Sequence, residues 1–349
     1  MKMTTDIDAE MQRGIDDGVF PAAELLVGAP QEIRYHKRFG ACQSNSLFDI
    51  ASLTKVVNTT TLCMMAVAER KLAVTDFLSQ RTSIPQHPSH DPIQLYHLLQ
   101  HSSGLPAYRR YYLELPVDDV ATPAGKEWII HACSKEPCEQ PVGERVVYSD
   151  VGFILLGRVL EEVYSEDLDV LFHQRIAKPL GLTNTSFHPT PEICLPSEDS
   201  PWRHRVVWGE CRDENCYAMG GVAGHAGLFG NAEDLHRFAS ALVKAHAGNK
   251  DFLNPEVVSA FLHPTTPPPH QPTRRVLGWD APDSKNSSAG SHFSPTTIGH
   301  LGHTGCSLWV DLERSLWVIL LTNRTYPNVE NDKIRSFRPI IHDLVLTHL

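Results

Sequence analysis

The length, composition and charge of the chain limit what kind of protein it can be. Its 349 residues can bury a large core, and 42% hydrophobic with 21% charged residues is ordinary for a globular protein. The net charge of -10 disfavours general nucleic-acid binding, which needs a basic face. No apolar run approaches the roughly 20 residues that a membrane span needs, so no membrane span is predicted.

The first residues and the cysteines indicate the cellular compartment in which the protein is expected. Residues 1–8 contain no apolar signal core, so the chain as given is predicted to be cytoplasmic; a periplasmic location stays open if a signal was removed. The eight cysteines are scattered, which favours reduced thiols over a disulfide framework. Cys133/Cys138 and Cys211/Cys216 leave four residues between them, and no compact histidine pair completes a zinc pattern. A zinc protein is therefore a weaker alternative.

The first 75 residues predict a mixed helix and strand region. Ile7, Met11 and Ile15 share one face of an amphipathic helix. In chain order the predicted elements are a helix over 5–18, strands Ala22–Val27 and Glu32–Arg38, and a buried helix that starts at Ser52 and ends near Lys71.

The middle third predicts helices and little strand. A short helix within Ile93–Pro106 is predicted to be capped by Gly104, and further helices are predicted over 123–134, 149–164 and 167–178. Residues 76–204 are therefore predicted to form an all-helical lobe inserted into an α/β lobe made of 1–75 and 205–349.

Strands and helices return after residue 205. The glycine-dense segment 220–230 lacks the spacing of a phosphate-binding loop, so its glycines are predicted to allow tight turns and close backbone approach. The remaining predicted elements are a helix over Ala232–Ala247, loops over His263–Gln271 and Ser284–Ser294, a hairpin of Ser307–Asp311 and Leu316–Thr322, and a helix over about 330–347.

These elements predict a two-lobed α+β fold that forms one unit over 1–349. Antiparallel strands from the two ends of the chain would pair into one sheet flanked by the terminal helices, with the helical lobe beside it. A small-molecule site is expected in the cleft between the lobes.

Ser52 and Lys55 are the first candidates for chemistry. Residues three apart at a helix start share one face, so the hydroxyl and the amine can touch, and a serine needs such a base to act as a nucleophile. The helix N-terminus would offer N–H groups to an oxyanion, and its dipole would make Lys55 ionise less readily. The alternative is a helix-capping serine and a surface lysine, but Lys55 is the only lysine of the chain with a serine three residues before it.

Two further motifs fit a nucleophilic serine. In Tyr148-Ser149-Asp150 the tyrosine could be a second proton carrier, although a packed tyrosine before an ordinary helix cap is the alternative. In the segment His303–Cys306 a polar triplet at a strand edge could hydrogen-bond substrate, and the N–H after the glycine could complete an oxyanion hole. The alternative for that segment is a glycine turn into a strand.

The three motifs in this order resemble the S-x-x-K, Y-x-[N/D] and [K/H]-T-G motifs of the penicillin-recognising serine hydrolases. The chain is most similar to the class C branch: class C β-lactamases, low-molecular-weight DD-peptidases and esterases of the β-lactamase/transpeptidase-like fold. The segments Leu98–Pro106 and Ala223–Phe229 resemble two further sequence signatures of that branch.

The resemblance implies a role for each motif residue. Ser52 would be acylated, Lys55 and Tyr148 would share the proton transfers, and the backbone N–H groups of Ser52 and Cys306 would form the oxyanion hole. Substrate contacts would come from four positions of the second and third motifs, which are Asp150, His303, Thr304 and Gly305. The resemblance implies no metal and no organic cofactor, and a small molecule or short peptide as substrate.

Two departures bear on the substrate. Asp150 stands where these β-lactamases usually carry asparagine; it can only accept hydrogen bonds when ionised, and it could pair with Lys55 and keep it protonated. His303 stands where they usually carry lysine, and it offers a weaker, pH-dependent charge to a substrate carboxylate. The predicted function is a serine hydrolase acting through an acyl-enzyme on small esters or D-amino-acid peptides, ahead of lactams. The alternative is a non-catalytic ligand-binding or scaffold protein with the same fold.

Overall fold

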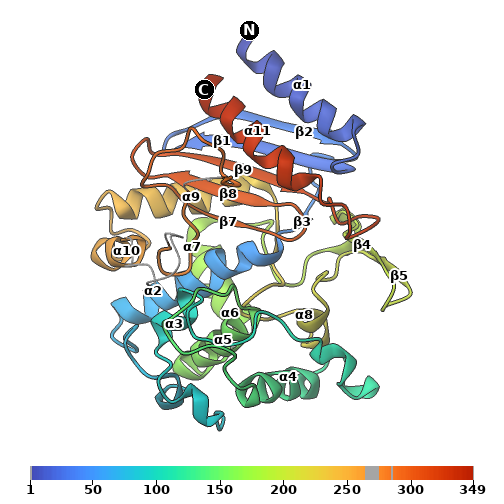
Figure 1. Cartoon of the computed structure of the whole chain (residues 1–349). Coiled ribbons are helices and arrows are strands. Elements are labelled where there is room, and N and C mark those ends of the chain that lie inside the picture. The colour runs from blue at the N-terminus through green and yellow to red at the C-terminus, as the bar shows by residue number, and fades with distance from the viewer. Residues whose placement is uncertain (1, 264–274, 284–285, 349) are drawn as a thin grey trace.

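A five-stranded antiparallel sheet forms one part of the molecule, and a group of helices forms the other (Figure 1). The computed structural model describes residues 2–263, 275–283 and 286–348. The strand order is β2–β1–β9–β8–β7, and the strands are β1 (Ala22–Ala29), β2 (Glu32–Gly40), β7 (Ile298–Leu301), β8 (Ser307–Asp311) and β9 (Leu316–Thr322). Because β1 pairs with β9, the two ends of the chain meet in one sheet, which confirms the predicted α+β fold class.

Different helices bury the two faces of the sheet. Alternate residues of β1 point to opposite faces: Ala23, Leu25 and Val27 belong to one apolar cluster, and Ala22 and Leu26 to another. The first cluster includes residues of α1 (Lys2–Asp16) and α11 (Ile334–His348), the terminal helices, and the second includes residues of α9 (Ala232–His246). The terminal helices therefore flank the sheet as predicted, but they cover only one of its faces, as Figure 1 shows.

The remaining helices pack around α5 and the chain that follows Ser52. These helices are α2 (Thr61–Ala68), α3 (Leu95–Leu99), α4 (Pro123–Lys135), α5 (Asp150–Tyr164), α6 (Leu168–Phe172), α7 (Lys178–Leu180), α8 (Glu214–Ala218) and α10 (Pro255–Leu262). Helix α5 starts where the Ser149 hydroxyl accepts the N–H of Gly152 at 3.0 Å, an N-cap that fixes the position of Asp150 in the first turn. Helices α2, α3 and α4 all contact α5.

Short pairs of strands were not predicted. They are β3 (Phe48–Asp49) with β6 (Phe229–Gly230), and β4 (Glu198–Ser200) with β5 (Arg205–Val207). The β3–β6 pair joins the chain before Ser52 to the glycine-dense segment. Strands of two residues are too short to show a periodic pattern, so the sequence could not indicate this pair. Helices α8 and α10 and strand β7 were also missed.

Two predicted helices differ from the observed ones. Helix α3 ends at Leu99, and Gly104 does not cap it, because His101 already adopts a left-handed conformation (φ 58°). Gly104 is needed instead for close approach, since a Cβ there would lie 2.1 Å from the Gln140 carbonyl oxygen. The helix predicted from Ser52 begins as a 3₁₀ turn, continues as a π-helical turn over Lys55–Thr60, and is α-helical only in α2.

Some predictions stay untested. The lobe boundaries at 75 and 205 remain predictions, and most of the predicted loop over His263–Gln271 lies outside the described residues, as do two residues of Ser284–Ser294. Within the described ranges, none of the helices combines the length and apolarity needed to cross a bilayer.

Candidate active site

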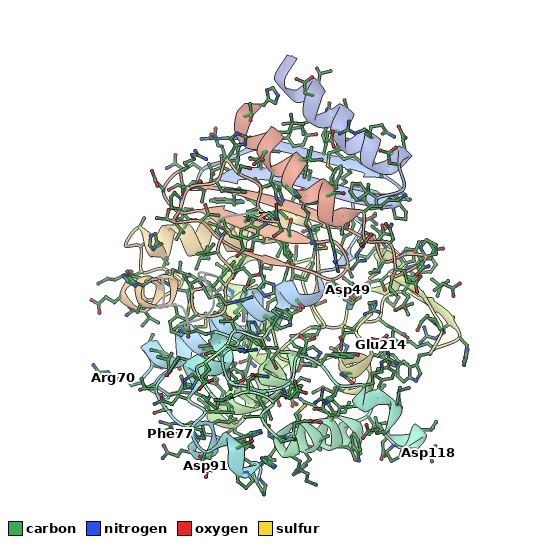
Figure 2. The ribbon with its side chains drawn as sticks, in the orientation of Figure 1. Asp49, Arg70, Phe77, Asp91, Asp118 and Glu214 are labelled. Carbon is green, nitrogen blue, oxygen red and sulfur yellow. The ribbon has the colours of Figure 1, made fainter. Side chains whose placement is uncertain are left out.

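Ser52 lies in a tight turn that Asp49 organises. The buried Asp49 carboxylate accepts the N–H of Ala51 at 2.8 Å and the N–H of Arg212 at 2.7 Å. Ala51 adopts a left-handed conformation with φ 48°, which is strained for a residue with a Cβ. Figure 2 places Asp49 at the junction of sheet and helices, whereas Arg70 and Asp118 lie at the outer rim. The turn therefore holds the Ser52 side chain where the two parts of the molecule meet.

Lys55 is fully buried and uses all three of its N–H donors. Its Nζ lies 3.0 Å from the Ser52 Oγ, 2.7 Å from the Asp150 Oδ1 and 3.0 Å from the carbonyl oxygen of His225. The structure thus brings together the predicted Ser52–Lys55 pair and also forms the Lys55–Asp150 pair that the sequence analysis had named as a possibility.

The pKa of Lys55 decides between two sequence-based expectations, a helix dipole that lowers it and a pair with Asp150 that keeps the lysine protonated. Burial alone would lower the pKa of Lys55, but the Asp150 carboxylate and Tyr148 outweigh it, and the net shift is upward. The helix dipole was expected to lower this pKa, and that expectation is wrong, because an ion pair at 2.7 Å acts more strongly than partial charges at a helix end. Lys55 is an ammonium in the free protein.

Tyr148 lies beside the same pair of residues. Lys55 Nζ is 4.8 Å from the centre of its ring, and the His101 ring packs on it at 4.5 Å. Burial raises the pKa of Tyr148, against the Lys55 charge and hydrogen bonding with Lys55 and Ser52. Lys55 and Tyr148 thus both carry their protons at neutral pH.

The turn from Gly302 to Cys306 lies against the Ser52 turn. The Thr304 hydroxyl donates to the Asp49 carbonyl oxygen at 2.7 Å, and a Cβ on Gly302 would lie 2.8 Å from the Ile50 carbonyl oxygen. Thr304 is buried, and its hydroxyl joins the two turns instead of facing the cavity. Among the described residues, neither the Ser52 N–H nor the Cys306 N–H has a hydrogen-bond acceptor. These are the two groups predicted to bind an oxyanion.

His303 faces the cavity but does not supply a positive charge. Burial, together with the neighbouring Arg212 and Arg324 guanidinium groups, lowers its pKa to about 4. The imidazole is therefore neutral at pH 7. The sequence could not show this, because both arginines are distant in the chain.

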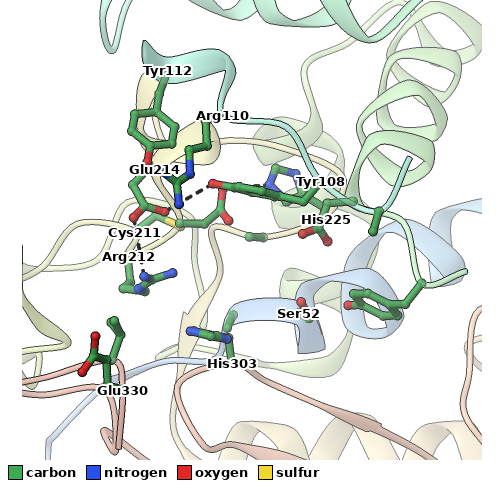
Figure 3. Close-up of a pocket in the computed structure, with 17 residues that line it drawn as sticks. Ser52, Tyr108, Arg110, Tyr112, Cys211, Arg212, Glu214, His225, His303 and Glu330 are labelled. Atoms are coloured by element: carbon green, nitrogen blue, oxygen red, sulfur yellow. Dashed lines mark hydrogen bonds and ion pairs between the residues drawn. The ribbon is translucent and has the colours of Figure 1, made fainter. Parts of the chain in front are cut away.

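A cavity of about 500 Å³ opens above Ser52 (Figure 3). Of the predicted residues, Ser52, Tyr148, Asp150 and His303 line it, while Lys55 lies beneath and Thr304–Cys306 lie behind. The walls also contain residues that the sequence analysis missed, which are Tyr108, Arg110, Tyr112, Cys211, Arg212, Asp213, Glu214, His225 and Glu330. The aromatic and basic run at 108–112, directly after the Leu98–Pro106 segment, was a usable signal for one wall.

The glycine-dense segment places His225 at the floor of the cavity. A Cβ on Gly224 would lie 2.1 Å from the Phe153 carbonyl oxygen, so only glycine allows the segment to pass this close to α5. This confirms the predicted close backbone approach. The His225 carbonyl can then bind Lys55, while its ring Nε2 lies 2.9 Å from the Asp213 Oδ1.

Comparisons with known proteins agree with this arrangement. Residues 7–339 match the family model described as Beta-lactamase, so the chain belongs to the beta-lactamase family. A protein of Salmonella enteritidis PT4 (strain P125109) named "Putative D-alanyl-D-alanine carboxypeptidase" is 28% identical over 94% of this chain and 84% of its own. Together with the esterase-like and penicillin-binding-protein-like structures below, the family identifies a serine hydrolase and confirms the resemblance seen in the motifs.

Solved structures share the fold at low sequence identity. The octameric penicillin-binding protein homologue from Pyrococcus abyssi has a TM-score of 0.73 at 19% identity, over 94% of this chain and 75% of that one. EstCE1, described as a hydrolase with promiscuous acyltransferase activity, has a TM-score of 0.73 at 20% identity, over 99% and 98%. Simvastatin synthase from Aspergillus terreus has a TM-score of 0.73 at 16% identity, over 99% and 98%. These matches support the β-lactamase/transpeptidase-like fold.

Proposed function

We propose that Ser52 of this serine hydrolase is acylated by small esters or D-amino-acid peptides and then deacylated by water. The observation that carries the proposal is the chain of contacts from Ser52 Oγ through the buried Lys55 Nζ to Asp150 Oδ1, at 3.0 and 2.7 Å. It lies at the base of a cavity beside the N–H groups of Ser52 and Cys306, which have no acceptor within the described part of the chain. A nucleophile, a proton path and an oxyanion hole are the parts that acyl transfer needs.

Asp150 is the final proton acceptor in this proposal. When Ser52 Oγ attacks the substrate carbonyl, its O–H bond breaks and the proton passes to Lys55, which gives one of its own protons to Asp150. The carbonyl oxygen becomes the oxyanion between the N–H groups of Ser52 and Cys306. The proton then returns through Lys55 and Tyr148 to the leaving group as the tetrahedral intermediate collapses, so the acyl-enzyme forms with no net change in protons.

The charges of the cavity favour peptides and esters over lactams. The neutral His303 offers no cation beside the nucleophile, and the Arg212 guanidinium is engaged by Glu198 at 3.1 Å and Glu214 at 3.5 Å. At the cavity wall, Arg110 has no ion pair within the part of the chain that the structure describes. It could hold the carboxylate of a short peptide at some distance from the reacting bond. The name of the Salmonella relative points to the same substrate class.

A substrate panel tests this proposal. Turnover of a p-nitrophenyl ester, an acylated D-alanyl-D-alanine peptide and a chromogenic cephalosporin is measured for wild type, Ser52→Ala and the exposed-serine control Ser44→Ala. We expect ester or peptide turnover in wild type and in the control, with loss of at least about 10³-fold in Ser52→Ala. Equal rates in wild type and Ser52→Ala would refute the assignment. Binding of the panel without any turnover would favour the non-catalytic alternative.

A further inference from the structure

Arg338 of α11 contacts the back of the turn that carries the Cys306 N–H. The side chain is buried, and its guanidinium donates to the carbonyl oxygens of Gly302 at 2.9 Å, Gly305 at 3.3 Å and Cys306 at 2.8 Å. Within the described residues, no carboxylate lies within ion-pair distance of it. A buried cation that binds only carbonyl groups is costly, so filling space is not a sufficient explanation for an arginine here.

Every carbonyl of the turn is held by a hydrogen bond from behind. Besides the three that Arg338 binds, the His303 carbonyl accepts from Arg324 Nε at 2.8 Å. The Thr304 carbonyl accepts from the Arg324 N–H at 3.0 Å and the Thr322 hydroxyl at 2.9 Å. The peptide planes of the turn therefore cannot rotate without breaking a bond, and the Cys306 N–H is fixed in direction.

The bond to Gly305 has a specific electronic consequence. The Gly305 carbonyl and the Cys306 N–H belong to the same peptide group. A cation that donates to the carbonyl draws electron density through the amide and makes the N–H at its other end a stronger donor. Among the residues that the structure describes, no counter-ion weakens the positive charge of Arg338. Although burial lowers its pKa to about 10, the side chain stays charged at pH 7.

We propose that Arg338 is a positioning residue for acyl transfer, which aims and polarises the Cys306 N–H so that it stabilises the oxyanion. This inference rests on the proposed role of Cys306 in the oxyanion hole. The N-terminal half of α11 thus contributes to the transition state from behind the turn that leads into β8, without contact to substrate. Arg338 thereby stabilises the tetrahedral species and not the bound substrate.

Two variants and one control test the proposal. Arg338→Gln removes the charge, Arg338→Lys keeps the charge but replaces the Nε and Nη2 donors by a single nitrogen, and Arg335→Gln removes an exposed arginine of the same helix. For each, kcat and KM for a p-nitrophenyl ester, the Kd of a boronic acid that forms a tetrahedral adduct, and the melting temperature are measured.

The expected result is a loss of kcat in Arg338→Gln with little change in KM. The loss should be roughly 10–30-fold, below the about 10²–10³-fold cost of removing a direct oxyanion donor. The boronic acid should bind more weakly by the same factor, Arg338→Lys should lose less, and Arg335→Gln should match wild type. If Arg338→Gln does not fold, the Arg338→Lys variant carries the same comparison.

Two outcomes overturn the inference, and they differ from failure of the proposed function. If Arg338→Lys or Arg338→Gln melts earlier but keeps the kcat and boronic-acid affinity of wild type, Arg338 is only structural. If KM rises as much as kcat falls, the side chain affects ground-state binding instead. If wild type itself shows no turnover and no boronic-acid adduct, the proposed hydrolase function fails before Arg338 is tested.

Discussion

Replacing Asp150 by asparagine removes the counter-ion of a buried lysine and changes little else in shape. Lys55 is fully buried, and its Nζ lies 2.7 Å from the Asp150 Oδ1. In Asp150→Asn the remaining bonds of Lys55 run to a hydroxyl and a backbone carbonyl, neither of which carries charge. The variant therefore isolates the effect of the carboxylate.

The magnitude follows from the distance and the burial. Two unit charges 2.7 Å apart attract by about 6 kcal/mol at an effective dielectric constant of 20, and breaking a buried pair by removing one partner costs about 3–5 kcal/mol. Because the Asp150 side chain is 19% exposed, we expect the lower end, a loss of about 3 kcal/mol in the free energy of unfolding at pH 6.

The loss should depend on pH in a defined direction. In wild type the pKa of Lys55 is higher in the folded protein than in the unfolded chain, where it is about 10.4. The stabilisation that results is complete below that unfolded pKa, so it is constant from pH 6 to 9. In Asp150→Asn the strongest effect that opposes burial is removed, and burial, the largest single effect on Lys55, lowers this pKa, so the unfolded chain binds the proton more tightly. Stability of the variant should then rise with pH, by at most about 1.4 kcal/mol per pH unit, and the gap to wild type should narrow towards pH 9.

Urea unfolding at pH 6, 7, 8 and 9 measures this gap. Asp167→Asn is the matched control, because Asp167 also pairs with a lysine but its side chain is 73% exposed; it should change stability by less than about 0.5 kcal/mol at every pH. In the proposed mechanism kcat of Asp150→Asn should also fall by about 10²-fold or more. A stability gap below about 1 kcal/mol, or one that does not narrow with pH, would refute the ion-pair account of Lys55.

Three further predictions concern the surroundings of the nucleophile. Burial raises the pKa of Asp49 to about 6, so its hydrogen bonds to the two backbone N–H groups should weaken as it protonates, and kcat/KM should fall below about pH 6. The Asp49→Asn variant should lack this fall in kcat/KM. A wild-type kcat/KM that is flat from pH 5 to 7 would contradict the role of Asp49 in holding the Ser52 turn. Arg110→Ala should raise KM about tenfold for a peptide with a free carboxylate but not for the corresponding peptide amide. The control Arg109→Ala should leave both KM values unchanged. Equal changes of KM for the two peptides in Arg110→Ala would exclude a contact between Arg110 and the carboxylate. Gly224→Ala should lower the free energy of unfolding by at least about 3 kcal/mol, because the new Cβ would lie 2.1 Å from a backbone oxygen. The control Gly152→Ala should be tolerated, because the nearest atom to its Cβ would be 3.5 Å away. Similar melting curves for the two variants would be inconsistent with this packing.

The parts of the fold that could be predicted are those set by local pattern. The helix with Ile7 and Met11 on one face and the hairpin of β8 and β9 depend on periodicity and turn residues, and the structure has both. The short spacing of Ser52 and Lys55 also placed two reactive groups in reach of each other, because it depends only on helical geometry.

The parts that failed depend on contacts between distant segments. Helix α3 ends at Leu99, two residues before the left-handed His101, whose Nδ1 accepts the N–H of Ser149, 48 residues away. The pKa of Lys55 is raised because Asp150 lies 2.7 Å away, and the pKa of His303 is lowered by burial and then by Arg212. A single sequence contains these residues but neither their distances nor their burial, which decide the sign of each pKa shift.

The cavity wall shows the same limit. Tyr108 and Arg110 come from the chain before α4, Glu214 from α8, and Glu330 from the chain before α11. None of these segments has a spacing that indicates chemistry, and only the fold brings them to one space above Ser52. The motifs therefore predicted the reacting groups better than the residues that select the substrate.

The most direct test of the central claim is the intact mass of the protein after incubation with a fluorophosphonate, for wild type and Ser52→Ala. We predict one covalent adduct on wild type, assigned to Ser52 by peptide mapping, and none on the folded Ser52→Ala variant. An adduct that persists in Ser52→Ala, or no adduct on folded wild type, would contradict the claim that Ser52 is the activated nucleophile.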